Sequence, residues 1–172
     1  LEVSTASTAL QALTDAVVYL FAYPYECSEQ VASRVLSIAA LRDVLSAFKA
    51  KGLPSKERIE AAVARDLQRL QNMQNDDGGW GFWLRYQRSW PFLSIHVTHA
   101  LLRAKQKGFT VPERMLTQAM EHIRHIERHI PSEYGAWVRR VLIAYSLYVR
   151  QVAGELDVAK ADLRPGLEGK RQ

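Results

Sequence analysis

The sequence predicts an all-α protein built from antiparallel helical hairpins. Apolar residues recur at the spacing of an α-helix along nearly the whole chain, and no segment shows the alternation of a strand. A pattern of helix end, proline and new helix also occurs twice. A chain of 172 residues is long enough for one domain with one core, and 48% hydrophobic and 24% charged residues are typical of a globular protein.

Six segments carry the helical pattern, and proline, glycine or a capping residue marks several of their ends. Pro24 ends the first segment, Gly52 ends the second, and Ser55 is the expected N-cap of the third. Residues 155–172 are expected to form a tail or the start of a truncated helix. The expected helices cover residues 7–22, 27–48, 55–74, 92–107, 112–130 and 133–152.

An internal repeat indicates that the hairpins are stacked. Residues 50–62 (AKGLPSKERIEAA) resemble residues 106–119 (QKGFTVPERMLTQA), because both place Lys-Gly at a helix end before a proline, Glu-Arg and a new helix. An aromatic corner follows each, GFW at 81–83 and GAW at 135–137. Repeats of this kind bury a shared core and build either a solenoid or a ring with an inner and an outer layer of helices.

The loop after the third expected helix favours the ring. Gln74, Gly78 and Trp80 follow the pattern Q-x-x-x-G-x-W, which resembles the glutamine–tryptophan motif of the triterpene cyclases, whose fold is an α/α toroid. In that motif the glutamine and the tryptophan tie helix ends together. Glycines also permit a tight reversal and a large ring covers helix ends, so we expect Trp80, Trp83 and Trp137 to lie at corners between helices and Trp80 to be mostly buried.

The net charge of +5 does not indicate a nucleic-acid-binding protein. Lysines and arginines are scattered among glutamates at helical spacing without any nucleic-acid-binding motif, as in a solvated basic surface. No apolar run reaches the length that crosses a bilayer. The first residue is not methionine and stands within a helical pattern, so we interpret the chain as a piece of a larger protein.

The stretch YPYECSEQ, residues 23–30, holds the only cysteine of the chain. A free cysteine is usually a buried structural residue. Cys27, however, stands at the expected start of a helix, where backbone amides stabilise a thiolate, and Gln30 lies one turn further on the same face. A thiolate beside a glutamine amide can attack the side-chain carbonyl and expel ammonia, which leaves an internal thioester.

Cys-x-Glu-Gln is similar to the thioester motif of the alpha-2-macroglobulin and complement family, and Tyr-Pro-Tyr-x-Cys-x-Glu-Gln resembles its bacterial branch. The loop DGGWGFW (77–83) and the segment SWPFLSIHVTHALLRAK (89–105) are similar to the same branch and follow in the same order. The resemblance covers residues 16–154, and by it residues 1–154 are identified as part of a thioester domain.

This resemblance implies an α/α toroid that acts as a protease inhibitor in bacterial defence, without a cofactor and without enzymatic turnover. Cys27 and Gln30 would form the thioester, and Tyr23 and Tyr25 would shield it from water. Cleavage of a bait segment elsewhere in the parent chain would expose the thioester to a lysine amine of the attacking protease. The family's bacterial members imply a periplasmic location, a lipid anchor on the parent chain and cell-wall synthesis proteins as further partners.

Two features depart from the family pattern. Glu26 stands where family members usually have glycine, and we expect its charge to disfavour a thiolate and its backbone to be strained if φ is positive there. The chain also provides about half of the hairpins of the family fold, so we expect an incomplete toroid.

Three histidines, His122, His125 and His129, fall within a narrow arc of one expected helix. Such a group could hold a metal, but no cysteine or carboxylate completes a recognised spacing, so we expect a boundary face and no metal site. In some complement relatives a histidine after a comparable helix takes the acyl group, which makes His129 the nearest candidate for that role. His96 and His99 have the positions of core or helix-interface residues.

Two alternatives remain open. An α/α-toroid enzyme related to the terpene cyclases needs acidic residues that line a cavity, whereas Asp76 and Asp77 stand beside Gly78 in an expected turn. A helical-repeat interaction module would have the same fold, with Cys27 packed in the core and no active thioester. The mass of the intact protein distinguishes a thioester-containing protease inhibitor from both alternatives, because thioester formation releases ammonia.

Overall fold

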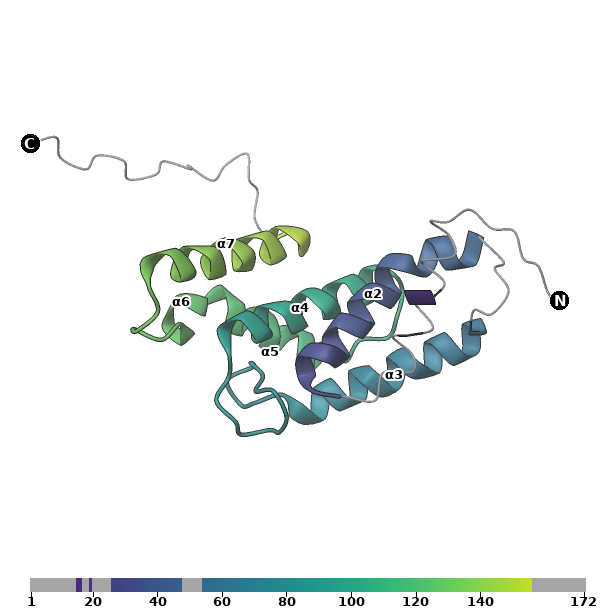
Figure 1. Cartoon of the computed structure of the whole chain (residues 1–172), viewed down its shortest axis with the longest axis horizontal. Helices are drawn as coiled ribbons and strands as arrows, with labels where there is room; N and C mark the ends of the chain where they lie inside the picture. Colours follow the sequence, from purple (N-terminus) through teal and green to yellow (C-terminus); the bar gives the residue numbers. More distant parts are fainter. Residues whose placement is uncertain (1–14, 17–18, 20–25, 48–53, 156–172) are drawn as a thin grey trace, which may run out of the picture.

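The computed structural model of the chain describes residues 15–16, 19, 26–47 and 54–155. None of these residues belongs to a strand, which confirms the all-α prediction, and no described helix is long and apolar enough to cross a membrane. Most of the first expected helix lies outside the described residues. The helices labelled in Figure 1 are α2 (Ser28–Ala47), α3 (Lys56–Met73), α4 (Pro91–Gln106), α5 (Glu113–Arg124), α6 (Ile126–His129) and α7 (Ala136–Val152).

Capping residues decide where two of these helices begin. The Ser55 side chain accepts a hydrogen bond from the backbone N–H of Arg58 at 3.3 Å, which confirms Ser55 as the N-cap of α3. Helix α4 begins with Pro91, one residue before the expected start. Proline is well suited to this first position, because the N–H that it lacks would have no partner within the helix.

The expected single helix over residues 112–130 is wrong, because the structure divides it into α5 and α6. At His125 the backbone has φ −109° and ψ 26°, and the N–H of His125 bonds to the carbonyl of His122, three residues earlier. This tighter bond ends the regular helix. The last helix also begins later than expected, at Ala136, because a turn over residues 131–134 precedes it.

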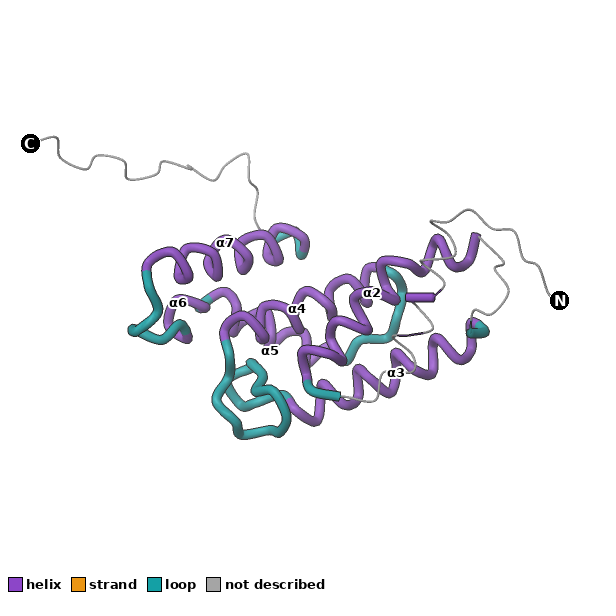
Figure 2. Tube along the Cα trace, in the orientation of Figure 1, coloured by secondary structure: helices purple, strands orange, loops and turns teal. Residues whose placement is uncertain are grey.

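Helix α4 lies at the centre of the fold. It packs against α2, α5 and α7, while α3 packs against α2. Helices α2, α3, α4 and α5 alternate in direction along the chain, as expected for hairpins (Figure 1), and Figure 2 shows the long loop that joins α3 to α4 at one end of the bundle. Because α4 has neighbours on several sides, its buried residues are spread around the helix: Pro91, Leu93, Ser94, Ile95, Val97, Thr98, Ala100, Leu101, Leu102 and Ala104.

The outer helices bury one face each. In α2, Val31, Val35 and Ile38 are fully buried, and their spacing of four and three residues places them on one side of the helix. In α3, Leu67 and Leu70 face the same core. The apolar positions that the sequence pattern assigns to the interior of α2 are therefore correct for these residues.

A buried ion pair joins α2 to α3. Arg34 donates two hydrogen bonds to the carboxylate of Asp66, from Nε to Oδ2 at 2.6 Å and from Nη2 to Oδ1 at 2.7 Å. The two side chains are only 3% and 1% exposed. The hydrogen bond and the charge of Asp66 raise the pKa of Arg34 against the effect of burial. Each charge therefore depends on the other for its place in the interior.

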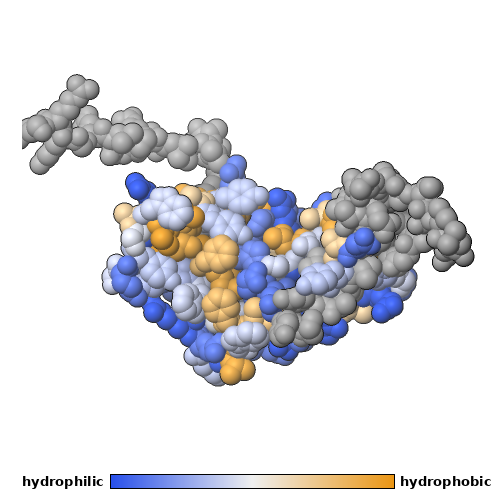
Figure 3. Space-filling view, viewed as in Figure 1, coloured by the Kyte–Doolittle hydropathy of each residue, from blue (hydrophilic) through white to orange (hydrophobic). Residues whose placement is uncertain are grey.

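One face of the molecule remains apolar and exposed. Figure 3 shows apolar side chains gathered in the region of α4 and α7. These two helices carry several large hydrophobic residues that the described part of the chain does not cover: Phe92, Trp137, Val138, Val141, Leu147 and Tyr148. A contiguous apolar face of this kind is typical of a surface that packs against further protein.

Candidate functional site

The loop between α3 and α4 is built around the glutamine, glycine and tryptophan of the sequence motif. The Gln74 side-chain amide donates to the carbonyls of Gly78 and Met115, both at 3.0 Å, and so ties the end of α3 to α5. Trp80 is fully buried, as predicted, and its indole N–H donates to the carbonyl of Leu70 at 2.8 Å. Gly78 has φ +83°, and a Cβ there would lie 2.3 Å from the carbonyl oxygen of Gln118. Only glycine fits this approach.

The other two tryptophans of the prediction also lie at corners, but in a different environment. Trp83 is in the α3–α4 loop and Trp137 is in the first turn of α7, and they are 54% and 70% exposed. Of these three corner tryptophans, only Trp80 is therefore part of the core.

Cys27 and Gln30 lie at the start of α2, as predicted. Cys27 is the residue before the first helical position and is 5% exposed. The side-chain carbonyl oxygen Oε1 of Gln30 accepts a hydrogen bond from the backbone N–H of Cys27 at 3.3 Å. A glutamine three residues after the N-cap makes this contact in a capping box. The same contact holds the carbonyl end of Gln30 beside Cys27, so the geometry is compatible with a structural cap and with a thioester.

The start of α2 is fastened to the α3–α4 loop. The backbone N–H of Ser28 donates to the carbonyl of Phe82 at 2.8 Å. The Ser28 hydroxyl lies within hydrogen-bond distance of the carbonyls of Gly81 and Phe82. A first-turn N–H has no partner within its own helix, so this loop supplies the partner that α2 lacks.

Glu26 has two cationic partners. Its φ angle involves residue 25, which lies outside the described residues, so the strain considered for Glu26 stays a prediction. The Glu26 carboxylate pairs with Arg69 at 3.0 Å and lies 4.0 Å from Arg34. These two guanidinium groups offset the negative charge that Glu26 places beside Cys27. Tyr23 and Tyr25, the expected shielding residues, lie outside the described residues.

A chain of polar side chains leads from α2 through α4 to α7. The Ser33 hydroxyl donates to Glu29 at 2.8 Å and contacts Nε2 of His96 at 2.9 Å. The Tyr145 hydroxyl contacts Nδ1 of His96 at 3.3 Å and Nδ1 of His99 at 3.2 Å. His96 and His99 are thus helix-interface residues, as predicted, and the chain begins at the glutamate of the Cys-Ser-Glu-Gln motif.

Burial keeps these histidines neutral. Burial lowers the pKa of His96, and burial together with the charges of Arg103 and His96 lowers the pKa of His99 to about 4. Burial likewise raises the pKa of Tyr145 to about 12. At neutral pH the hydrogen-bonded side chains that link Ser33 to His99, those of His96 and Tyr145, are therefore uncharged.

We expect the free energy of unfolding to fall as the pH decreases from about 6.5 towards 4. In this window the unfolded chain protonates His99 at its ordinary pKa, whereas the folded chain resists protonation, so acid favours unfolding. Urea unfolding at several pH values measures the slope. His99→Gln should reduce the slope, while His125→Gln, at an exposed position, should leave it unchanged. An identical slope in all three proteins would contradict the assignment to His99.

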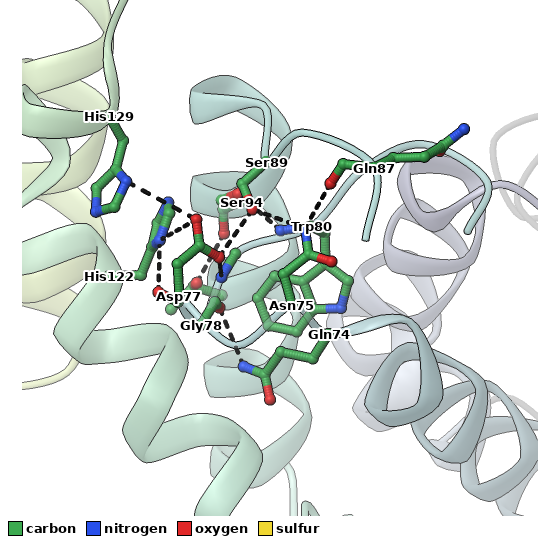
Figure 4. A network of polar contacts seen from close by, with 12 residues as sticks. Gln74, Asn75, Asp77, Gly78, Trp80, Gln87, Ser89, Ser94, His122 and His129 are labelled. Carbon is green, nitrogen blue, oxygen red and sulfur yellow. Dashed lines mark hydrogen bonds and ion pairs between the residues drawn. The ribbon is translucent and has the colours of Figure 1, made fainter. Parts of the chain in front are cut away.

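The three histidines of the expected arc do not share one face. Because the helix breaks at His125, the His125 ring turns to Glu121, with Nε2 3.1 Å from Oε1. His122 and His129 instead stack with ring centroids 3.8 Å apart, and both lie beside Asp77 (Figure 4). Burial lowers the pKa of both His122 and His129, and the charge of His129 lowers that of His122 further. Sequence spacing could not show Asp77 in this group, because it precedes His122 by 45 residues.

Asp77 serves the turn, as expected, whereas Asp76 lines a pocket in which the other charged residues described are Arg85 and Arg114, so this pocket is not the acidic cavity of a cyclase. Asp76 is exposed and pairs with Arg85 at 2.6 Å. Asp77 accepts a hydrogen bond from the N–H of Gly79 at 2.9 Å, two residues later. This is the local bond that an aspartate makes in a turn.

Comparison with known proteins finds several relatives named alpha-2-macroglobulin, and also the circularly permutated Ras protein 2 of Dictyostelium discoideum, which is 26% identical over 134 residues, or 72% of the chain, and of whose length the match covers 3%. No protein-family profile matches the chain. The chain is 32% identical over 126 residues to the alpha-2-macroglobulin of Thermotoga maritima and 34% identical over 105 residues to that of Escherichia coli K12, which covers 72% and 60% of the chain. It spans only 7% and 6% of the length of these relatives.

A solved structure, that of Salmonella alpha-2-macroglobulin reacted with methylamine, has a similar fold. It superposes with a TM-score of 0.71 at 24% identity, over 86% of this chain and 10% of the Salmonella chain. At this identity the likeness concerns the fold alone. The arrangement of α2 to α7 thus also occurs as a small part of a much longer protein.

Proposed function

Because the chain belongs to the bacterial alpha-2-macroglobulin family, we propose that it is part of a thioester domain in which Cys27 and Gln30 form an internal thioester. The contact between Gln30 Oε1 and the Cys27 N–H is the observation that carries this proposal. It holds the amide carbonyl of Gln30 at Cys27 in a site where the cysteine is 5% exposed. Burial of this kind slows hydrolysis, because a thioester reacts with water that reaches it.

The proposed bond formation needs no further reagent. Sγ of Cys27 attacks Cδ of Gln30, the C–S bond forms and the C–N bond breaks, and ammonia leaves with the thiol proton. The guanidinium groups of Arg69 and Arg34 offset the negative charge of Glu26 beside the attacking sulfur. That the Salmonella relative was solved after reaction with methylamine supports acyl chemistry with amines in this family.

The proposed activity is covalent capture of proteases by the parent protein. Cleavage of a bait segment outside this chain exposes the acyl group of Gln30, a lysine amine of the protease attacks it, an amide forms and the Cys27 thiol is released. Each thioester acts once, so the protein is an inhibitor and not an enzyme. His129, the candidate to relay the acyl group, stacks on His122 and lies 3.9 Å from Asp77. Amines are the proposed acceptors, because no residue is assigned to relay the acyl group to hydroxyls.

Two further parts of the proposal concern the surroundings of the domain. Residues 1–154 would form part of an α/α toroid, and the exposed apolar face on α4 and α7 is where its other helices would pack. The rest of the parent chain is therefore a partner of this surface. We also propose a periplasmic location with a lipid anchor on the parent chain, and contact with cell-wall synthesis proteins, on the resemblance to bacterial relatives.

A second candidate is an interaction module without an active thioester. The capping-box geometry favours it, because a glutamine at this position stabilises α2 whether or not it reacts. Gln30→Glu separates the two functions. Glutamate makes the same cap but has no amide nitrogen to lose as ammonia.

We expect the protein with its complete toroid to have an intact mass about 17 Da below that of its sequence, because thioester formation releases ammonia. Methylamine should add about 31 Da by forming an N-methyl amide at Gln30, which brings the mass to about 14 Da above that of the sequence, and should release one thiol. Gln30→Glu should abolish methylamine uptake and leave the unfolding transition unchanged. Free labelling of Cys27 in the untreated protein, without methylamine uptake, would contradict the thioester and favour the interaction module.

A further inference from the structure

We propose that Asp77, His122 and His129 form a binding site for a divalent cation with the coordination preference of zinc. One possible ligand atom of each residue lies within 4.8 Å of the others. The residues come from the α3–α4 loop, the last turn of α5 and the end of α6, and Figure 4 shows them facing one another. Two imidazoles and a carboxylate are a ligand set that zinc uses, with a water molecule in the fourth position.

The Asp77 carboxylate is oriented for this role. Its Oδ1 accepts hydrogen bonds from the Gly79 N–H at 2.9 Å and from the Ser89 hydroxyl at 2.8 Å. Oδ2 then points at both imidazoles, 3.8 Å from Nδ1 of His122 and 3.9 Å from Nδ1 of His129. These separations are too long for hydrogen bonds. The separation between Oδ2 and Nδ1 of His129 approaches the distance of about 3.4 Å between two ligands of a tetrahedral zinc with bonds of about 2.0–2.1 Å.

His122 has one nitrogen anchored and the other without a partner. Nδ1 donates its hydrogen to the backbone carbonyl of Asp77 at 2.8 Å, so the lone pair of the neutral ring is on Nε2. Nε2 is buried, and no described residue forms a hydrogen bond with it. Metal-binding histidines use this arrangement, in which one N–H bonds to a carbonyl and the other nitrogen binds the ion. A cation would satisfy a buried nitrogen that is otherwise unpaired.

His129 gives the site access to solvent. Its side chain is 28% exposed and that of Asp77 is 40% exposed, so an ion can enter from this side. The His129 ring is stacked on His122 with 24° between the planes, and binding would turn it until its nitrogen faces the ion. The break at His125 directs α6 so that His129 returns beside His122. The carboxylate that the sequence pattern lacks is therefore supplied by the α3–α4 loop.

Titration of the untagged, chelator-free chain with zinc chloride tests the proposal. Calorimetry should show one ion bound per chain near neutral pH, and zinc should raise the midpoint of thermal unfolding, because the ion connects the loop to α5 and α6. His129→Asn and Asp77→Asn should each weaken binding by about tenfold or more. Far-UV circular dichroism verifies that these variants are folded.

Two control variants show whether zinc binds at Asp77, His122 and His129 and not elsewhere. His125→Asn should bind zinc as the unchanged chain does, because the His125 ring pairs with Glu121 outside the cluster. Cys27→Ser should also retain zinc, although it removes the proposed thioester, so the two proposals fail independently. Absence of saturable binding, or equal affinity in His129→Asn and the unchanged chain, would overturn the metal site.

Discussion

Trp80→Ala is expected to lower the free energy of unfolding by about 3–5 kcal/mol. The indole is completely buried and is one of the largest side chains of the core. Its removal leaves a cavity, and it also leaves the Leu70 carbonyl without the indole N–H that bonds to it at 2.8 Å. Urea unfolding followed by far-UV circular dichroism measures the loss.

Trp83→Ala is the control for this change. Trp83 is in the same loop but is 54% exposed, so its loss should cost roughly 0.5 kcal/mol or less. A cost below about 1 kcal/mol for Trp80→Ala would mean that the tryptophan is not an anchor of the loop.

Asp66→Asn should be comparably destabilising, by about 3–5 kcal/mol, because it removes the buried carboxylate that Arg34 bonds and leaves only the half-buried Glu26, 4.0 Å away, as a charge partner. The change keeps the size of the side chain, so the electrostatic loss dominates. Chemical unfolding again provides the measurement. In a double variant, Arg34→Met with Asp66→Leu, both charges are removed and much of the stability should return.

Asp76→Asn offers a matched comparison. Asp76 and Arg85 pair at 2.6 Å, as close as Arg34 and Asp66, but their side chains are 79% and 42% exposed. Loss of this pair should cost only about 0–1 kcal/mol, since water already solvates both groups. Equal costs for Asp66→Asn and Asp76→Asn would show that burial does not strengthen the dependence of Arg34 on its partner.

Sequence patterns predict the helices and their caps well where the signal is local. Ser55 caps α3 because its hydroxyl reaches an N–H three residues away, and Trp80 is buried because the glycines before it allow the chain to turn inward. The break at His125 had no such signal. Neither proline nor glycine stands there, and the helical period continues across it into α6.

The candidate site was predictable only where its members are neighbours in the chain. Cys27 and Gln30 are three residues apart, so helical geometry alone brings them together. Asp66 and Arg34 are 32 residues apart, and Asp77 and His122 are 45 apart. Contacts of this kind depend on how α2, α3 and α5 pack, and a periodic pattern states which face of a helix is buried but not which partner covers it.

The bond from Ser28 to the α3–α4 loop has a consequence for the order of folding. The Ser28 hydroxyl and its acceptors are 53 and 54 residues apart in the chain, so this contact closes a long loop and forms late relative to the turns of α2. Until it forms, the first turn of α2 lacks a tertiary anchor and frays like any isolated helix end. The contact of Cys27 with Gln30 needs only the first turn of α2, and docking of the α3–α4 loop then holds that turn in place.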